Sequence, residues 1–147
     1  HDAPAERLQV WTERFADSAP TKQVIVAEID AQLAGFCCVF PDHSPTDGHL
    51  LDNLHVHPDH HGKGIGKRLM QRAATGLAEA EKEGDIFLWV LTTNTAGIGF
   101  YEHLGGRPGR TELHHFPGGA VPPALLMSWP LAEMAGWNFP GQTPVDH

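Results

Sequence analysis

The sequence of 147 residues is poor in cysteine, in positive charge and in long apolar runs. Its two cysteines, Cys37 and Cys38, are adjacent in an apolar run, so they cannot form a disulfide framework and are predicted to be buried, reduced thiols. Lys and Arg number 10 against 18 Asp and Glu, which argues against a nucleic-acid-binding surface. No run approaches the roughly 20 apolar residues of a membrane span, and no signal-peptide pattern opens the chain. These absences predict a cytoplasmic protein with neither nucleic acid nor a membrane among its partners.

The length and the hydrophobic content of 41% suit a single domain over residues 1–147 that folds around its own core. The patterned part covers about residues 5–131, and residues 132–147 are predicted to be a C-terminal tail because they show no periodicity. The first residue, His1, is not a methionine, and a helical pattern begins almost at once. We therefore expect the native chain to continue upstream.

The first half of the chain predicts a helix followed by three strands. Within residues 5–17, Leu8, Trp11 and Phe15 recur at helical spacing, which predicts an amphipathic helix. Residues 23–29 and 33–40 are β-rich runs separated by polar residues, as in an antiparallel hairpin. A loop is expected over residues 41–48 because Pro, Asp, Ser and Gly dominate it, and residues 49–56 alternate as a third strand.

The second half predicts an alternation of helices and strands. Apolar residues recur every three or four positions from Ile65 to Ala80, which predicts a helix that runs to about residue 83 and is capped by Gly84. Residues 86–92 form a short, continuously apolar strand, residues 94–106 a short helix closed by glycines, and residues 110–129 a terminal hairpin. The expected fold class is α/β, with a central sheet that changes from antiparallel to parallel and is flanked by helices.

A glycine-rich turn, "HPDHHGKGIGKRLM" at residues 57–70, lies between the third strand and the long helix. In such a turn, backbone amides and the positive end of the helix dipole point at one spot, where an anion can bind. The turn does not match the P-loop pattern, because no glycine precedes Gly66 by five positions and Arg68 follows Lys67. It does not complete the dinucleotide pattern either, because Lys67 or Leu69 occupies the place of the third glycine. A turn that binds nothing remains an alternative at this point.

Residues 61–66, "HGKGIG", resemble the [QR]-x-x-G-x-[GA] pyrophosphate loop of the GNAT superfamily of N-acetyltransferases, with His61 in place of Gln or Arg. The preceding "LDNLHVHPDH" is similar to the strand and proline turn that lead into that loop in the family. "NTAGIGFYEHLGG" is similar to the second family segment and carries Asn94 and Tyr101 at the expected spacing. The resemblance covers about residues 23–106. It departs at Gly106, where the family usually has an aromatic residue.

The resemblance implies acetyl-CoA as the co-substrate, with its pantetheine arm inserted between the third and fourth strands. Backbone groups and side chains along the glycine turn would bind the cofactor; the expected residues are Leu54, Val56, His61, Gly62, Lys63, Gly64, Ile65, Gly66 and Lys67. Arg68 can add charge near the phosphates. Asn94 would contact the pantetheine or cap the short helix, and the two roles are compatible.

Acetyl transfer to an amine requires a general acid for the departing thiolate and a neutral amine nucleophile. By resemblance, Tyr101, the only tyrosine in the chain, is the expected acid. Alternation along the third strand is expected to put His55 on one face with Leu51 and Asn53, which makes His55 a candidate base, and Asp52 is its rival. The expected acceptor is an amine of a small molecule or a peptide. The alternative is a catalytically inactive acyl-CoA-binding sensor or scaffold domain.

The remaining features carry weaker expectations. His55, His57, His60 and His61 cluster, but without cysteine partners or zinc-finger spacing they predict no metal site. The four tryptophans, Trp11, Trp89, Trp129 and Trp137, are interpreted as core or interface residues rather than substrate contacts. The family's N-terminal strand and helix are expected to be absent from this chain. The sheet would then have an open edge that a homodimer can pair.

Overall fold

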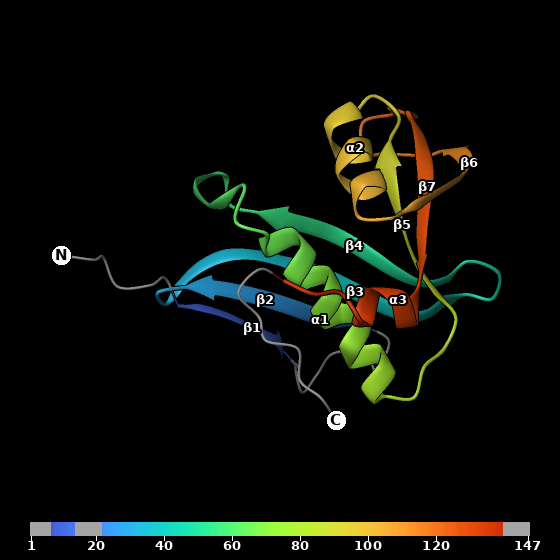
Figure 1. Cartoon of the computed structure of the whole chain (residues 1–147). Helices are drawn as coiled ribbons and strands as arrows, with labels where there is room; N and C mark the ends of the chain where they lie inside the picture. The colour runs from blue at the N-terminus through green and yellow to red at the C-terminus, as the bar shows by residue number, and fades with distance from the viewer. Residues whose placement is uncertain (1–6, 14–21, 140–147) are drawn as a thin grey trace.

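The computed structural model describes residues 7–13 and 22–139, which form one seven-stranded mixed sheet with helices on it (Figure 1). The strand order is β1-β2-β3-β4-β5-β7-β6. The strands are β1 (Leu8–Glu13), β2 (Gln23–Ile29), β3 (Gln32–Ser44), β4 (Gly48–Val56), β5 (Asp85–Leu91), β6 (Arg107–Leu113) and β7 (Pro123–Pro130). All neighbouring pairs are antiparallel except β4 and β5, which are parallel, so the predicted change from antiparallel to parallel is confirmed.

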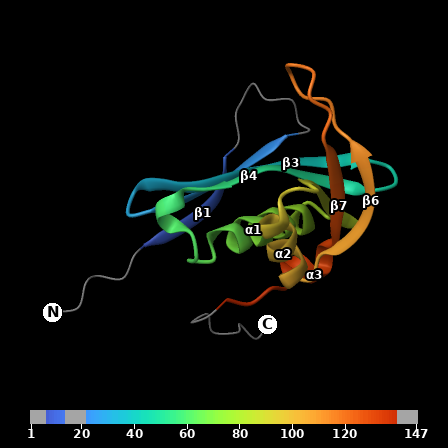
Figure 2. The ribbon, with the colours of Figure 1, turned by 90° about the horizontal axis from the view of Figure 1, so that it is seen from above.

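The helices are α1 (Ile65–Glu79), α2 (Thr95–His103) and α3 (Leu131–Ala135), together with a short 3-10 turn, η1 (Pro58–His60). Viewed from above, α1, α2 and α3 lie on the same side of the sheet, while the connection between β6 and β7 projects to the other side (Figure 2). Helix α1 buries one apolar stripe, from Ile65 through Leu69 and Ala73 to Leu77, against the sheet. One face of the sheet is therefore covered by helices.

The predicted helix over residues 5–17 is wrong where the structure describes it, because Leu8–Glu13 form strand β1. The strand pairs antiparallel with β2, from Leu8 opposite Ile29 to Glu13 opposite Val24. Leu8 and Val10, which alternate with Gln9, pack against the core. Burial against the edge of β2 therefore outweighs the helical spacing of Leu8 and Trp11. The sheet's first strand is thus present, and the open edge of β2 that suggested a homodimer is occupied by β1.

The predicted hairpin at residues 23–40 and the predicted third strand are confirmed as β2, β3 and β4. The loop expected from residue 41 is shorter than predicted, since β3 continues to Ser44 and pairs there with Gly48. Helix α1 ends at Glu79 rather than near residue 83, and its C-cap is Ala80 instead of Gly84. Gly84 has a φ of +97° in the turn before β5, a conformation that glycine adopts without strain.

The buried core continues past residue 131, where the sequence suggested that a tail begins. Met134 of α3 and Phe139 are buried, and Gln71 of α1 donates hydrogen bonds to the carbonyls of Ala135 and Trp137. The segment after β7 therefore packs along α1. Within the described residues, none of the helices is both long and apolar enough to cross a membrane.

Both cysteines are free and buried, as the sequence predicted. Burial raises the pKa of the Cys37 thiol, and the neighbouring Cys38 adds to the effect. Cys37 is therefore an uncharged thiol near neutral pH, and it packs in the core beneath α1.

A β-bulge interrupts the alternation of β4. Cys38 of β3 faces Asp52, but Phe36 faces His55, so two residues of β4, Asn53 and Leu54, oppose the single residue between them. Asn53 has a φ of +54°, a left-handed conformation that Asn tolerates better than most residues. The bulge reverses the faces that follow it: Leu54 and Val56 pack toward the core on the side of Leu51.

This reversal corrects the predicted position of His55. The sequence put His55 on the same face as Leu51, whereas the structure has it exposed on the opposite side, with its ring 5.7 Å from that of Phe36. The prediction failed because strict alternation assumes one residue per position along the ladder, and the bulge inserts one more.

Strands β4 and β5 pair at only two positions, His49 with Ile86 and Leu50 with Phe87. Beyond Leu50 the two strands diverge, whereas β5 stays paired with β7 along its whole length. In Figure 1, β5 and α2 accordingly rise away from β4. The insertion of a pantetheine arm expected between the third and fourth strands requires them to separate, and their separation here opens a gap in the middle of the sheet.

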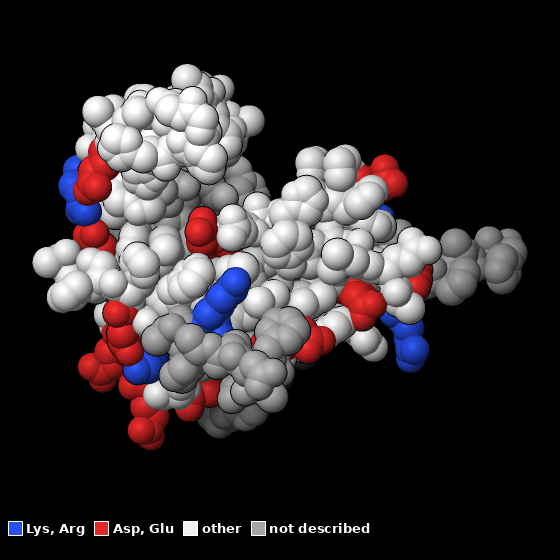
Figure 3. Space-filling view, turned by 180° about the vertical axis from the view of Figure 1, so that it is seen from behind, with Lys and Arg blue, Asp and Glu red and all other residues white. Residues whose placement is uncertain are grey.

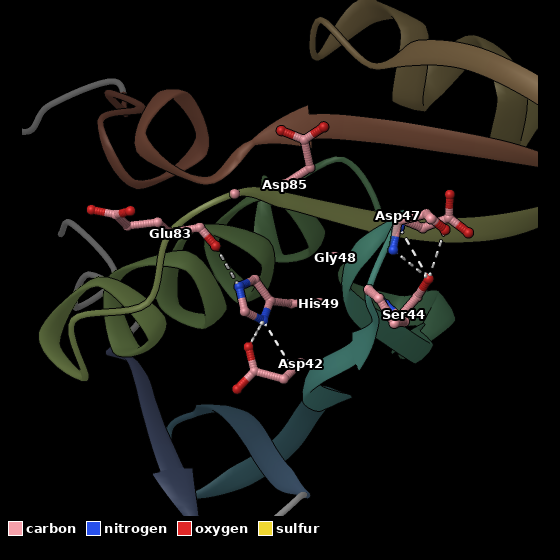
Figure 4. A pocket seen from close by; sticks show the side chains of 10 residues that line it. Asp42, Ser44, Asp47, Gly48, His49, Glu83 and Asp85 are labelled. Carbon is pink, nitrogen blue, oxygen red and sulfur yellow. Dashed lines mark hydrogen bonds and ion pairs between the residues drawn. The ribbon is translucent and has the colours of Figure 1, made fainter.

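His49 lies at the closed end of the β4–β5 pair and is only 2% exposed (Figure 4). Its Nδ1 accepts a hydrogen bond from the amide of Asp42 at 2.9 Å, and its Nε2 donates to the carbonyl oxygen of Glu83 at 2.8 Å. The ring therefore links β4 to β3 and to the turn before β5. The acidic cavity beside it, about 450 Å³, lies at the opposite end of the pair from the gap.

Replacing His49 with Leu should lower the free energy of unfolding by about 1–3 kcal/mol, because the amide of Asp42 and the carbonyl of Glu83 lose the part-buried hydrogen bonds that the buried ring makes with them. Urea unfolding measures the change. The matched control is His55→Leu on the same strand, where the exposed side chain makes the expected change about 0.5 kcal/mol or less. Equal effects of the two substitutions would contradict the role assigned to His49.

Candidate functional site

A cavity of about 810 Å³ lies between the glycine turn and α2. Of the residues predicted to bind a cofactor, it is lined by Leu54, Val56, His61, Gly62, Gly64, Ile65 and Gly66. Phe100 and Tyr101 of α2 form the opposite wall. Figure 3 shows the molecule from behind, where the surface is notched between the lobe that carries α2 and the glycine turn, and the visible walls are largely free of charged side chains.

The glycine turn holds its backbone in conformations that favour glycine. Gly62 has a φ of +83°, and Gly64, the N-cap of α1, has a φ of +76°. No atom lies within 4 Å of where a Cβ would be at either position, so the positive φ rather than crowding requires glycine. Helix α1 begins at Ile65, and the first amides of a helix have no partner within it. These amides, with the helix dipole, can bind an anion.

His61 anchors the turn to the end of β4. Its Nε2 donates a hydrogen bond to the carbonyl oxygen of Val56 at 2.9 Å, five residues earlier. The side chain thus closes the loop that η1 begins. A glutamine amide can donate the same bond, which explains how His61 stands where the GNAT pattern has Gln or Arg.

The cations near the turn contact other groups and do not line this cavity. Lys63 lies 3.0 Å from the ring of His60. The ammonium of Lys67 donates to the carbonyl of Asn138 at 2.9 Å and lies 5.0 Å from the centre of the Phe139 ring. The guanidinium of Arg68 lies over the same ring at 4.4 Å. Any anion bound in the cavity would therefore depend first on backbone amides.

A second cavity, about 290 Å³, fills the gap between the diverging strands. It is lined by residues 51–54 of β4, residues 88–91 of β5, Asn94 and Tyr101. It shares Leu54 and Tyr101 with the larger cavity. Tyr101 therefore stands where the two cavities meet, which is the position that a group acting on a ligand spanning both must have.

The ring of Tyr101 is held by aromatic neighbours. It lies 5.9 Å from the ring of Trp129, edge to face, and Trp129 is fully buried and donates its Nε1 hydrogen to the carbonyl of Leu104 at 3.3 Å. A Cβ at Gly106 would lie 2.7 Å from the Trp129 ring, so glycine is required there. Trp129 thus occupies the space that a side chain at position 106 would enter, where the family pattern usually has an aromatic residue.

The environment of Tyr101 raises the pKa of its phenol. Burial is the larger cause, because the phenolate loses hydration, and the Cys37 thiol adds a smaller contribution. The phenol therefore stays protonated across the physiological range, so it carries a proton that a departing thiolate could take.

Asn94 caps α2: its Oδ1 accepts a hydrogen bond from the amide of Gly97 at 2.9 Å. A Cβ at Gly97 would lie 2.5 Å from the Asn94 amide nitrogen, so this glycine allows the cap to form. Asn94 also lines the cavity between the strands. Both of its predicted positions, as a cap and beside a pantetheine path, are thus compatible with the geometry.

The two candidate bases lie in different surroundings. Asp52 lines the same cavity as Tyr101, and its carboxylate accepts the amide of Asn53 at 2.9 Å. His55 lines a separate, open cavity with Phe36, Asn53 and Leu54. The residues that line the gap therefore include Asp52 and exclude His55.

Sequence reasoning did not single out Phe100, and it interpreted Trp89 as a core or interface residue rather than one that lines a cavity. Phe100 lines the glycine cavity, and its ring approaches the position of a Cβ on Gly66 at 3.4 Å. Trp89 lines the gap, and its ring is 4.7 Å from that of His114. The signal for Phe100 was its place beside Tyr101 in the helix. For Trp89, alternation in a continuously apolar strand gave no indication of which face borders a cavity.

Comparisons with known proteins agree with this geometry. The family model described as the acetyltransferase (GNAT) family matches residues 1–106. Streptothricin acetyltransferase of Streptomyces lavendulae is 32% identical over 90 residues, which cover 60% of this chain and 46% of that protein. The chain thus spans about half the length of this curated relative.

Two solved structures share the fold. A nourseothricin acetyltransferase is 29% identical and superposes with a TM-score of 0.67, covering 76% of this chain and 66% of that one. A GNAT family acetyltransferase from Elizabethkingia anophelis, solved with acetyl-CoA bound, is 11% identical, with a TM-score of 0.65 and coverage of 84% and 97%. The second likeness supports the fold alone.

Tyr101 is the only tyrosine in the chain, so the absorbance of tyrosinate reports on this residue by itself. We expect its ionisation midpoint in the folded protein to lie above the value of about 10 for a free tyrosine and to return to that value in denaturant. Because the folded pKa is raised, the stability linked to it is complete below pH about 10 and is lost as the pH rises through the folded pKa. A folded midpoint at or below that of the denatured protein would contradict the buried position of the phenol.

Proposed function

The chain belongs to the acetyltransferase (GNAT) family, and we propose that it transfers the acetyl group of acetyl-CoA directly to an amine of a small molecule or a peptide. The observation that carries the proposal is the pairing of two features in one site. A glycine turn with unpartnered helix amides lies at one end of a gap between parallel strands, and a protonated tyrosine lies in that gap.

Acetyl-CoA suits the connected cavities by shape and charge. Its pyrophosphate would bind the first amides of α1 and the turn from Gly62 to Lys67. Its pantetheine arm would run beside the backbone of Leu54 and Val56 toward Tyr101. The carbonyl of Val56 already accepts a bond from His61, and β3 pairs with one edge of this strand, so the backbone groups on the other edge are the ones left for the arm.

The proposed reaction is a single displacement. The nitrogen of the neutral amine attacks the thioester carbonyl carbon, the C–S bond of the tetrahedral intermediate breaks, and the thiolate takes a proton from the phenol of Tyr101. The ammonium proton of the acceptor passes to a base. Tyr101 is regenerated by the proton that the base releases to solvent, so the step needs no further reactant.

We propose Asp52 as that base, because it is the carboxylate that lines the cavity of Tyr101. His55, which the sequence favoured, is the second candidate. Its exposed ring and its separate cavity would require a water chain to reach the acceptor nitrogen.

The acceptor class has support from relatives of this chain. The two most similar proteins described above are named for the acetylation of streptothricin and of nourseothricin, and the family resemblance leaves peptide amines open. The formal charge of −8 favours a cationic acceptor over an anionic one. A cytoplasmic location and a homodimer remain predictions.

Replacing Gly64 with Val should abolish acetyl-CoA binding in titration calorimetry, because a β-branched residue resists a φ of +76° and its side chain would enter the cavity. His61→Gln should leave the affinity nearly intact, since the glutamine amide can reach the Val56 carbonyl. The matched control is Gly84→Val, which puts the same residue at a φ of +97° away from the cavity. Loss of binding in the Gly84 variant would mean that general strain governs affinity, and loss in the His61 variant would mean that the turn is held differently from the way proposed here.

The pH profile of kcat/KM distinguishes the two candidate bases. Asp52→Asn should lower kcat/KM by about a hundredfold or more and remove the acidic limb of the profile, since that limb reports protonation of the base. His55→Ala should keep the limb, with acetyl-CoA affinity unchanged in both variants. A limb that disappears only in the His55 variant would assign the base to His55. Acetyl-CoA binding without thiol release for any amine would instead support the inactive sensor or scaffold.

A further inference from the structure

A third cavity, about 350 Å³, lies against the face of the sheet opposite α1. Its lining comes from β3, β4, β5 and the β6–β7 hairpin and includes His43, Asp52, Trp89, Leu91, His114 and Phe116. On β5, Trp89 alternates with Leu88 and Val90, which pack in the core beneath the helices. The cavity is therefore separated from α1 by the thickness of the sheet.

This cavity continues the path that begins at the glycine turn. It shares Asp52, Trp89 and Leu91 with the cavity in the β4–β5 gap. The gap cavity in turn shares Leu54 and Tyr101 with the cavity at the glycine turn. A cofactor that enters from the glycine turn and ends at Tyr101 would thus point its acetyl group toward the third cavity.

Charge changes sign along this path. At the glycine turn, helix amides and histidines face the cavity, and no carboxylate lines it. In the third cavity the sole formal charge among the lining residues is the carboxylate of Asp52. The nearby guanidinium of Arg110, 5.4 Å from the Trp89 ring, is held by both carboxylate oxygens of Asp47 and by Glu112. Its positive charge is therefore compensated outside the cavity, and the field inside favours a cation.

Apart from Asp52 and two histidines, the residues that line the cavity are apolar or aromatic. The Trp89 and His114 rings meet at 4.7 Å with an interplanar angle of 64°, which fixes both against each other. Phe116 follows β6 and is 46% exposed, so it borders the mouth of the cavity. Such walls stabilise an uncharged apolar or aromatic body, and an ammonium near aromatic rings gains further attraction.

We propose that this cavity is the acceptor pocket and that its ligand is a small protonated primary amine carried on an uncharged apolar or aromatic body. The proposal rests on the proposed acetyl transfer and specifies its acceptor. Asp52 binds the ammonium and lies on the path to Tyr101, while Trp89, His114 and Phe116 hold the body. A carboxylate next to the amine is rejected, because it would face the like charge of Asp52 in the same cavity.

Phenethylamine and L-phenylalanine form a matched pair of probes, since they share the amine and the ring and differ by one carboxylate. Calorimetric titration of the protein saturated with CoA should show phenethylamine binding at least about tenfold more tightly. Asp52→Asn should remove that difference. Phe116→Ala should weaken phenethylamine binding about threefold or more through lost apolar contact, and as an exposed residue it should leave the fold intact.

Two variants control for charge and for exposed apolar area. Asp85→Asn removes a carboxylate at the other end of the β4–β5 pair, and Leu113→Ala removes an apolar side chain, 66% exposed, from the same hairpin as Phe116. Neither lines the third cavity, and neither should change phenethylamine binding. Equal binding of the two probes, no detectable phenethylamine binding, or unchanged binding in the Asp52 and Phe116 variants would overturn the proposal.

Acetylation of the same amines, followed by thiol release, separates this proposal from the one on which it rests. If other amines are acetylated with a kcat/KM that Phe116→Ala leaves unchanged, the proposed acetyl transfer stands and the proposed acceptor pocket is wrong. If the amines bind as expected but no thiol is released, the cavity is an amine-binding site and the proposed acetyl transfer is wrong.

Discussion

The divergence of β4 and β5 is the constraint on which the rest of this structure depends. The strands share two paired positions, His49 with Ile86 and Leu50 with Phe87, and then separate. Beyond that point backbone groups that would pair in a continuous sheet face a gap, and an unpaired ladder is costly unless a ligand or water satisfies it. β5 can diverge because β7 pairs with its other side over its whole length. His49 holds the closed end, so the separation has a fixed starting point.

The side chains around the gap follow from that geometry. The bulge at Asn53 turns Leu54 and Val56 toward the core and leaves Asp52 at the gap, and α2 brings Tyr101 to the same place from the other side. The Trp129 ring packs edge to face against the ring of Tyr101, and Gly106 leaves room for the Trp129 ring. The glycine at position 106, where the family pattern usually has an aromatic residue, is thus accompanied by the large side chain of Trp129 in the same space.

The acidic composition is compatible with the proposed anion site, because that site would use backbone amides rather than cationic side chains. Lys67 and Arg68 contact Asn138 and Phe139 of the segment after α3, and Lys63 contacts His60. The glycine turn offers amides and a helix N-terminus, which carry no net charge and need none from the surface. A cation can then be attracted at the other end of the path by a single carboxylate.

The sequence by itself determined the glycine turn, the helix that follows it, the strands on either side of the gap and the place of Tyr101 in a short helix, because local periodicity and glycine spacing act within a few residues. It could not determine that residues 8–13 form a strand, since helical spacing and alternation compete there and pairing with β2 decides. It could not locate the bulge in β4, so it put His55 on the wrong face. Which of the two candidate bases borders Tyr101, and that Trp89 and Phe116 line a cavity, were decided only by the tertiary structure, because these contacts join strands that are far apart in the chain.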